Sequence, residues 1–330
     1  MTLLKVRSES WPIRGSFTIS RGSKTTAEVV VVELSRNGDP GGHIGRGEAV
    51  PYARYGESME SVLDQIESLH GALAQGLDRH GLQALLPAGA ARNAVDLAFW
   101  DLESKLSGKR HWELAGLPAP QPVTTAFTLS LDTVENMAAK AADNAKRPLL
   151  KLKLAGPDDL DRVAAVRRNA PKARIIVDAN EGWTAAQYSE LAPRLLALGV
   201  EMIEQPLPAG DDAALAGIAR PVPVCADESC HDTATLAGLE GRYDMINIKL
   251  DKTGGLTEAL KLKAAAEAAG YGIMVGCMLA TSLAMAPGVL LAQGVPVVDL
   301  DGPLLLAEDR DPALRIEDSL VYPPGTALWG

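Results

Sequence analysis

The sequence predicts an α/β protein, a barrel of the (β/α)8 type preceded by a smaller α+β domain. From residue 123 onward, short apolar strand segments alternate with helix-forming segments about every 25 residues, which is the pattern of parallel βα units that close into a barrel. Before that point, strand-like segments precede helical ones, an order typical of an α+β unit. A doubly wound sheet is the competing architecture, but no glycine-rich dinucleotide or P-loop motif supports it.

The first domain is expected to span residues 1–117. Turn-forming sequence such as "RNGDPGG" separates its strands, which we expect at residues 2–12, 28–35 and 43–50. Apolar residues at helical spacing place its two helices from Ser58 to about Gly76 and from Ala90 to about Ser107.

The second domain, residues 118–309, is expected to form the barrel. Its eight strands are predicted at residues 123–131, 149–155, 174–180, 201–206, 222–229, 245–252, 272–278 and 296–302. Helix-forming sequence follows every strand except the last, so the eighth helix is expected to be missing or short. We expect the tail, residues 310–330, to pack back on the first domain.

Composition narrows the class of protein. The net charge of −10 argues against a nucleic-acid partner, because such proteins present a basic face. No apolar stretch reaches the roughly 18 residues of a membrane span, and the chain starts without an apolar signal segment. Cys225, Cys230 and Cys277 form no closed disulfide set, so we expect the reducing cytoplasm. The oligomeric state stays open, a homo-oligomer included.

Carboxylates stand at the ends of three successive predicted strands: Asp178, Glu204 and Asp227. A single acid at such a position can simply cap a helix. Three on adjacent strands would converge at the mouth of the barrel, where catalytic groups lie, and their mutual repulsion calls for a cation. Oxygen ligands favour Mg²⁺, and the absence of histidine and cysteine disfavours zinc. The sequence therefore predicts one Mg²⁺ per subunit, held by these three residues.

Lysines flank the predicted metal site. Lys151 and Lys153 share one face of strand 149–155, and Lys249 lies on strand 245–252, on the opposite side of the barrel. Lys153 and Lys249 would thus face each other across a metal-bound carboxylate, where nearby cations are expected to lower their pKa values. Such a pair could remove an α-proton from one face and return one to the other, through an enediolate that the metal stabilises. Lys151 is expected to hold the anionic substrate and to tune Lys153.

With these residues in order, the chain resembles the muconate-lactonizing subgroup of the enolase superfamily over essentially its whole length. The resemblance implies a modified (β/α)7β barrel whose mouth is capped by the N-terminal domain. The subgroup includes muconate cycloisomerases, o-succinylbenzoate synthases and N-acylamino acid racemases, so the shared motifs do not select the reaction. They are "KLK" at Lys151, "VDAN" at Asp178, "IEQP" at Glu204, "CADES" at Asp227 and "NIKLDKTGG" at Lys249.

A sixth motif, "VDLDGP", is similar to that of the L-Ala-D/L-Glu epimerases, the dipeptide epimerases of bacteria. The resemblance implies that Asp299 and Asp301 bind the α-ammonium group of the substrate, and two carboxylates suit such a cation. It also implies that Arg21 binds the glutamate side-chain carboxylate. The loop Pro51–Ser58 would be a second lid, with Tyr52, Arg54 and Tyr55 as unranked contacts.

The implied activity is Mg²⁺-dependent inversion of the C-terminal α-carbon of a dipeptide such as L-Ala-L-Glu or L-Ala-D-Glu, in the recycling of murein peptides. Three alternatives stay open. One is a dipeptide epimerase with another side-chain preference. A second is an enzyme of the o-succinylbenzoate synthase or N-acylamino acid racemase type, which would leave Asp299 and Asp301 without a cationic partner. The third is a non-catalytic dipeptide-binding protein, which would not need both lysines.

Overall fold

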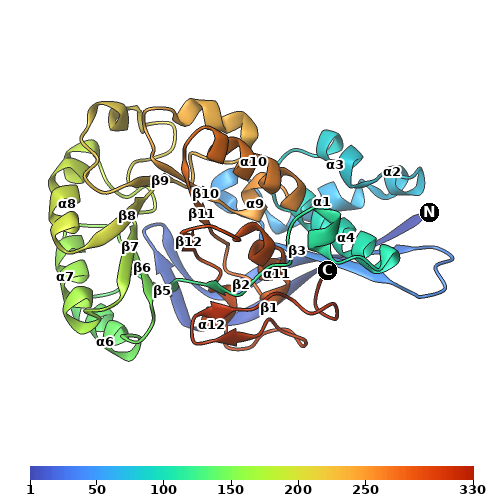
Figure 1. Ribbon diagram of the computed structural model, residues 1–330, viewed down its shortest axis with the longest axis horizontal. Coiled ribbons are helices and arrows are strands. Elements are labelled where there is room, and N and C mark those ends of the chain that lie inside the picture. The colour runs from blue at the N-terminus through green and yellow to red at the C-terminus, as the bar shows by residue number, and fades with distance from the viewer.

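Eight parallel strands form the centre of the structure, a computed structural model that describes residues 1–330 (Figure 1). Neighbouring strands pair in chain order, and a backbone hydrogen bond of 2.7 Å from Ala126 N–H to Val298 O joins the first strand region to the last. The predicted barrel with its separate N-terminal domain is therefore confirmed. The strands are β5 (Phe127–Leu129), β6 (Leu149–Lys153), β7 (Arg174–Asp178), β8 (Val200–Glu204), β9 (Val224–Ala226), β10 (Met245–Ile248), β11 (Gly272–Val275) and β12 (Val297–Val298).

Helices surround most of this sheet, and apolar residues of both layers form a core of 57 buried residues that reaches into the N-terminal domain. The helices are α6 (Val134–Asp143), α7 (Asp159–Asn169), α8 (Ala185–Ala197), α9 (Leu250–Thr253), α10 (Leu256–Ala268), α11 (Ser282–Leu291) and α12 (Gly302–Leu305). The last has only four residues, in agreement with the expected short eighth helix.

The strict alternation of strand and α-helix is wrong at two connections. After β8 and β9 the chain forms only short 3-10 helices, η2 (Ala213–Gly217) and η3 (Thr233–Leu239). In the first connection, Pro206, Pro208 and Pro221 lack the backbone N–H that a continuous α-helix needs.

The N-terminal domain is a three-stranded antiparallel sheet covered by helices, with its own core of 18 buried residues. The predicted helix from Ser58 is broken at Ser68, whose hydroxyl donates to the carbonyl of Gln65. The short helix α3 was not predicted. The elements are β1 (Thr2–Ile19), β2 (Gly22–Arg36), β3 (Ile44–Ala49), η1 (Ala53–Tyr55), α1 (Met59–Glu67), α2 (His70–Ala74), α3 (Arg79–Leu85), α4 (Ala90–Ser107) and α5 (His111–Leu114).

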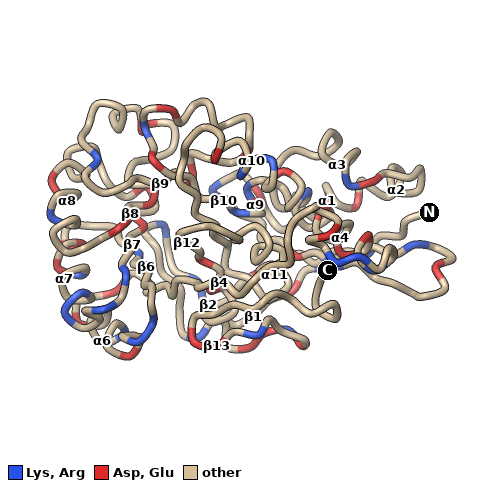
Figure 2. Tube along the Cα trace, viewed as in Figure 1, with Lys and Arg blue, Asp and Glu red and all other residues tan.

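The tail contacts both domains. Strands β13 (Ile316–Glu317) and β14 (Leu320–Val321) pair with β4 (Val123–Thr124), which precedes the barrel strands. Farther along, the indole of Trp329 donates a hydrogen bond of 3.1 Å to the carbonyl of Leu97 on α4. Acidic and basic residues are interspersed over both domains (Figure 2). Among the helices, none combines the length and the apolar character that crossing a membrane requires.

His111 makes the contact between tail and α5 sensitive to acid. Its imidazole is buried beside Trp329, and burial lowers its pKa from 6.5 to about 4. The unfolded chain protonates His111 more readily than the folded chain does. The neutral imidazole therefore contributes fully to the free energy of unfolding above pH 6.5, and this contribution, about 3 kcal/mol in total, is lost as the pH falls towards 4. We expect His111→Gln to flatten the fall in Tm between pH 7 and pH 5. Identical pH profiles for the two proteins would contradict this.

Candidate active site

The interior of the barrel is built in layers. Its apolar floor is a cluster of seven buried residues: Ala126, Leu149, Ile176, Met202, Cys225, Met274 and Val297. Side chains two residues apart on a strand point to the same face, so the next layer towards the carboxyl ends also faces inward. Five of the floor positions are followed in this way by charged residues of the predicted site: Lys151, Asp178, Glu204, Asp227 and Asp299. The strand period therefore places the polar layer on an apolar base.

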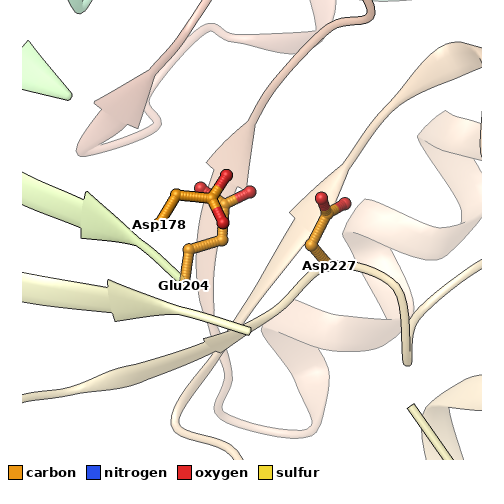
Figure 3. A group of neighbouring side chains, drawn as sticks. All are labelled: Asp178, Glu204 and Asp227. Atoms are coloured by element: carbon orange, nitrogen blue, oxygen red, sulfur yellow. The ribbon is translucent and has the colours of Figure 1, made fainter. Parts of the chain in front are cut away.

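Three carboxylates of this layer share one space. Asp178, Glu204 and Asp227 come from the adjacent strand ends of β7, β8 and β9, and all three are buried (Figure 3). One oxygen of each lies within 4.8 Å of an oxygen of the others. A buried set of oxygen donors without nitrogen or sulfur fits a hard divalent cation such as Mg²⁺. The predicted metal ligands are thus brought together.

Lys151 and Lys153 lie against these carboxylates. The ammonium group of Lys153 is 2.6 Å from Asp178 Oδ2. Lys151 Nζ is 2.7 Å from Glu204 Oε2 and 2.8 Å from Asp299 Oδ2. All five side chains are buried, so the charges are compensated within the site rather than by water.

Lys249 and a lysine that the sequence analysis did not assign share the third carboxylate. Lys249 Nζ is 2.6 Å from Asp227 Oδ2, and Lys252 Nζ is 2.7 Å from Asp227 Oδ1. Lys252 also donates a hydrogen bond of 2.9 Å to the carbonyl of Asn247. The side chain of Asn247 in turn donates to Glu204 Oε1. The sequence signal that could have identified Lys252 is its three-residue spacing from Lys249, which places both lysines on one side of a helical turn.

The expected lowering of lysine pKa values is not what this arrangement produces for Lys249. Burial works to lower its pKa, but the carboxylates of Asp227 and Glu204 outweigh burial and hold the pKa well above its ordinary value. The pKa of Lys151 is raised in the same way by its carboxylate neighbours. Conversely, burial opposes ionisation of Asp178, yet the adjacent ammonium groups lower its pKa to about 2. Close ammonium–carboxylate pairs therefore connect the lysines and the carboxylates of the site.

Asp299 and Asp301 follow β12 and are buried beside the lysines. Asp299 uses Oδ2 for Lys151, and its Oδ1 is buried without a hydrogen-bond partner. Asp301 Oδ2 accepts a 2.6 Å hydrogen bond from the backbone N–H of Thr128. Burial and the charge of Asp299 raise the pKa of Asp301 to about 7. The pair therefore offers one unused buried oxygen, on Asp299.

The tip of the β1–β2 hairpin reaches the barrel mouth and brings Arg21 there. Its Nη1 donates to the carbonyl of Asn180 at 2.9 Å and to Glu181 at 3.0 Å. Its Nη2 donates to the hydroxyl of Tyr52 at 2.9 Å and to Glu228 at 2.7 Å. The four terminal N–H groups of this guanidinium are therefore already used within the protein. Binding of a substrate carboxylate by Arg21 stays a prediction, and it requires Arg21 to exchange one of these partners.

Arg54, on the second lid, also binds Glu181: its Nε and Nη2 donate hydrogen bonds of 2.8 and 2.7 Å to the Glu181 carboxylate. Glu181 and Asn180 have positive φ angles of 66° and 45°, a strained backbone for residues with side chains. The loop beyond Asp178 is therefore held in an unusual conformation by Arg21 of the β1–β2 hairpin and Arg54 of the second lid.

A cavity of about 400 Å³ lies between the hairpin, the second lid and the barrel mouth. Lys153, Lys249 and Asp227 line its barrel side. Of the five cationic side chains that line it, Lys24 alone makes no ion pair; the others are Arg21, Arg54, Lys153 and Lys249. Sequence reasoning missed Lys24, although it lies three residues after Arg21 on the strand that follows.

Comparison with known proteins covers the whole chain. Residues 1–116 match the mandelate racemase/muconate lactonizing enzyme N-terminal domain, and residues 133–326 match the enolase C-terminal domain-like family. The L-Ala-D/L-Glu epimerase of Escherichia coli (strain K12) is 49% identical over 317 residues, covering 96% of this chain and 98% of that protein. The N-acetyl-D-glutamate racemase of Pseudoalteromonas sp is 44% identical over 288 residues, or 87% of this chain and 91% of that protein.

Among solved structures, an enolase family member from Agrobacterium tumefaciens with homology to dipeptide epimerases has a TM-score of 0.97 and 56% identity, covering 100% of both chains. That structure contains sodium and L-Ala-L-Glu with an ordered loop. The two domain matches and the identity over nearly the full length point to the same family as the buried carboxylate cluster and its lysines. The chain belongs to the mandelate racemase/muconate lactonizing enzyme family of the enolase superfamily.

Proposed function

We propose that the protein is a dipeptide epimerase that inverts the α-carbon of the C-terminal residue of L-Ala-D/L-Glu. The observation that carries this proposal is the placement of Lys153 and Lys249. Lys153 ends β6, and Lys249 follows β10. These strands are four apart in an eight-stranded barrel, so the two lysines stand on opposite sides of one cavity. Two opposed amines are what proton removal from one face of an α-carbon and return to the other require.

In the proposed reaction, Asp178, Glu204 and Asp227 hold Mg²⁺, which would offset the negative charge gained by the substrate carboxylate when the α-proton leaves. One lysine, Lys153 or Lys249, accepts that proton as a neutral amine, a form that bound Mg²⁺ would favour by drawing Asp178 and Asp227 away from the ammonium groups. The other, as an ammonium group, donates a proton to the opposite face, so one proton is taken and one is returned. Lys151 supports the substrate carboxylate.

The substrate is proposed to lie with its free N-terminus at Asp299 and Asp301. The unpartnered oxygen of Asp299 supports this, because a buried carboxylate oxygen without a donor is costly and an α-ammonium group would supply one. The acidic side chain is proposed to face Arg21 and Lys24, where Lys24 has no carboxylate of the protein to pair with. The three unpaired cysteines support a place in the cytoplasm, where murein peptides are recycled.

A second candidate is racemisation of an N-acylated glutamate, favoured by the likeness to the N-acetyl-D-glutamate racemase. It would use the same metal and lysines but would leave the unpartnered oxygen of Asp299 without an ammonium group.

The two functions are separated by incubation in D₂O with Mg²⁺ of L-Ala-L-Glu, L-Ala-D-Glu, N-acetyl-L-glutamate and L-Ala-L-Leu, followed by mass spectrometry and chiral chromatography. We expect deuterium at the C-terminal α-carbon, with inversion, for both Ala-Glu epimers. Exchange confined to N-acetyl-L-glutamate would establish the second candidate. The absence of exchange in every compound would reject both.

Lys24→Met is expected to lower kcat/KM for L-Ala-L-Glu about 10- to 100-fold, the equivalent of one lost charge-assisted hydrogen bond. The rate for L-Ala-L-Leu should stay within about threefold, because that substrate has no side-chain charge. Lys261→Met, on the exposed side of α10, is the matched control. Equal losses for the two dipeptides would assign Lys24 a structural role only.

A further inference from the structure

The chain segment after Lys249 is held by the N-terminal domain as well as by the barrel, which it contacts through Lys252. Asp251 lies two residues beyond Lys249, in α9, and is buried. Its Oδ1 accepts hydrogen bonds of 2.9 Å from the backbone N–H of Val50, the residue before the second lid, and of 2.9 Å from the side chain of Asn93 on α4. One carboxylate oxygen thus joins the lid, α4 and the segment that carries Lys249.

The residues of α4 next to Asn93 continue this attachment. Arg92 donates to the carbonyls of Thr253 at 2.7 Å and Gly254 at 3.1 Å. Asp96, one turn farther along, accepts a 3.1 Å hydrogen bond from the backbone N–H of Thr257. These groups are buried, so water could not take the place of a hydrogen-bond partner removed by substitution.

Two glycines allow the close approach of the segment to α4. Gly254 and Gly255 have φ angles of +69° and +115°, which side chains rarely adopt. A Cβ atom on Gly254 would lie 2.4 Å from Arg92, and one on Gly255 would lie 2.4 Å from Asp96. The backbone after Lys249 is therefore fixed directly on the surface of α4.

The backbone after Lys153 is held differently. The N–H groups of Ala155 and Gly156 donate to the carboxylate of Asp159 at 3.1 and 2.9 Å. The N–H group of Leu154 donates a hydrogen bond of 2.9 Å to the carbonyl of Asp178. All of these partners belong to the barrel. The N-terminal domain thus holds the backbone after Lys249 in addition to the barrel, whereas the backbone after Lys153 is held by the barrel through these hydrogen bonds.

We propose that Asp251 is a positioning residue through which the N-terminal domain sets the place of Lys249, and not that of Lys153. The proposal rests on the two-base epimerase function. Proton transfer needs the amine within hydrogen-bond reach of the α-carbon, and a misplacement of about 1 Å can cost about 100-fold in rate. Loss of Asp251 should therefore weaken one of the two proton transfers selectively.

The test is exchange of the α-proton with D₂O, without inversion, measured separately for L-Ala-L-Glu and L-Ala-D-Glu. Lys249→Ala and Lys153→Ala first define which epimer depends on which lysine. Asp251→Ala is expected to lower exchange of the Lys249-dependent epimer about 10- to 100-fold and to leave the other within about threefold. Asp251→Asn, which keeps Oδ1 as an acceptor, should restore both rates.

Glu48→Ala is the matched control, because Glu48 is also buried and also joins the N-terminal domain to the barrel, through Thr281. It should lower Tm and change the two exchange rates alike. If Asp251→Ala does not fold, Asn93→Ala removes only one of the two hydrogen bonds and should give the same asymmetry at smaller size. Equal losses for both epimers, or none for either, would overturn the inference. If the two lysine variants themselves fail to separate the epimers, the proposed function is at fault instead.

Discussion

Lys153→Ala and Lys249→Ala should each lower the rate of epimerisation of L-Ala-L-Glu about 10³-fold, the contribution of a positioned acid or base. Inversion needs both transfers, so the loss of either lysine blocks both directions of the reaction equally. Chiral chromatography of the reaction mixture measures the rate. Retention of epimerisation within tenfold by either variant would contradict the two-base assignment.

The variants should differ in exchange although they agree in inversion. In each, the remaining lysine can remove a proton from the epimer that presents it and return deuterium to the same face. Lys153→Ala and Lys249→Ala are therefore expected to exchange opposite epimers. Lys261→Ala, an exposed lysine on α10, is the control and should behave like the unchanged protein.

Asp227→Ala should destabilise the protein by about 3–5 kcal/mol, the range for breaking a buried ion pair by removal of one partner. The side chain compensates two buried cations, with Lys249 Nζ at 2.6 Å and Lys252 Nζ at 2.7 Å. Its loss leaves both ammonium groups without their carboxylate. Urea unfolding in the presence of EDTA measures the change in the free energy of unfolding without a contribution from bound metal.

A double-mutant cycle identifies the cause. Lys252→Met removes one of the two cations, so Asp227→Ala should cost at least about 1 kcal/mol less in that background than in the unchanged protein. Strict additivity of the two substitutions would show that Asp227 stabilises the fold through something other than these charges.

The strand period made the polar layer predictable. Asp178, Glu204 and Lys151 each stand two residues beyond an apolar residue of the floor, so alternation along a strand indicated their direction. In the same way, the short run after "VDLDGP" indicated the weak eighth helix. These are local patterns, which a single segment of sequence contains.

The contacts between distant segments could not be predicted in this way. The partners of Arg21 lie 31 to 207 residues away along the chain, and no local pattern indicates that Glu228 and Glu181 would occupy its guanidinium. Asp251 was quoted within a motif but received no role, because its partner Asn93 is 158 residues distant. The η2 connection was misjudged because helix-forming alanines and leucines stand between prolines.

The layered interior sets an apolar floor beneath the charged groups of the proposed chemistry. The floor residues, such as Ile176 and Met202 on adjacent strands, form one apolar cluster, whereas the groups above them pair mainly among themselves. Substitutions in layers that share few partners tend to have additive effects. A combinatorial library of the upper positions that keeps their buried charges paired, with the floor unchanged, would therefore explore new reactions while most of its members still closed the same barrel.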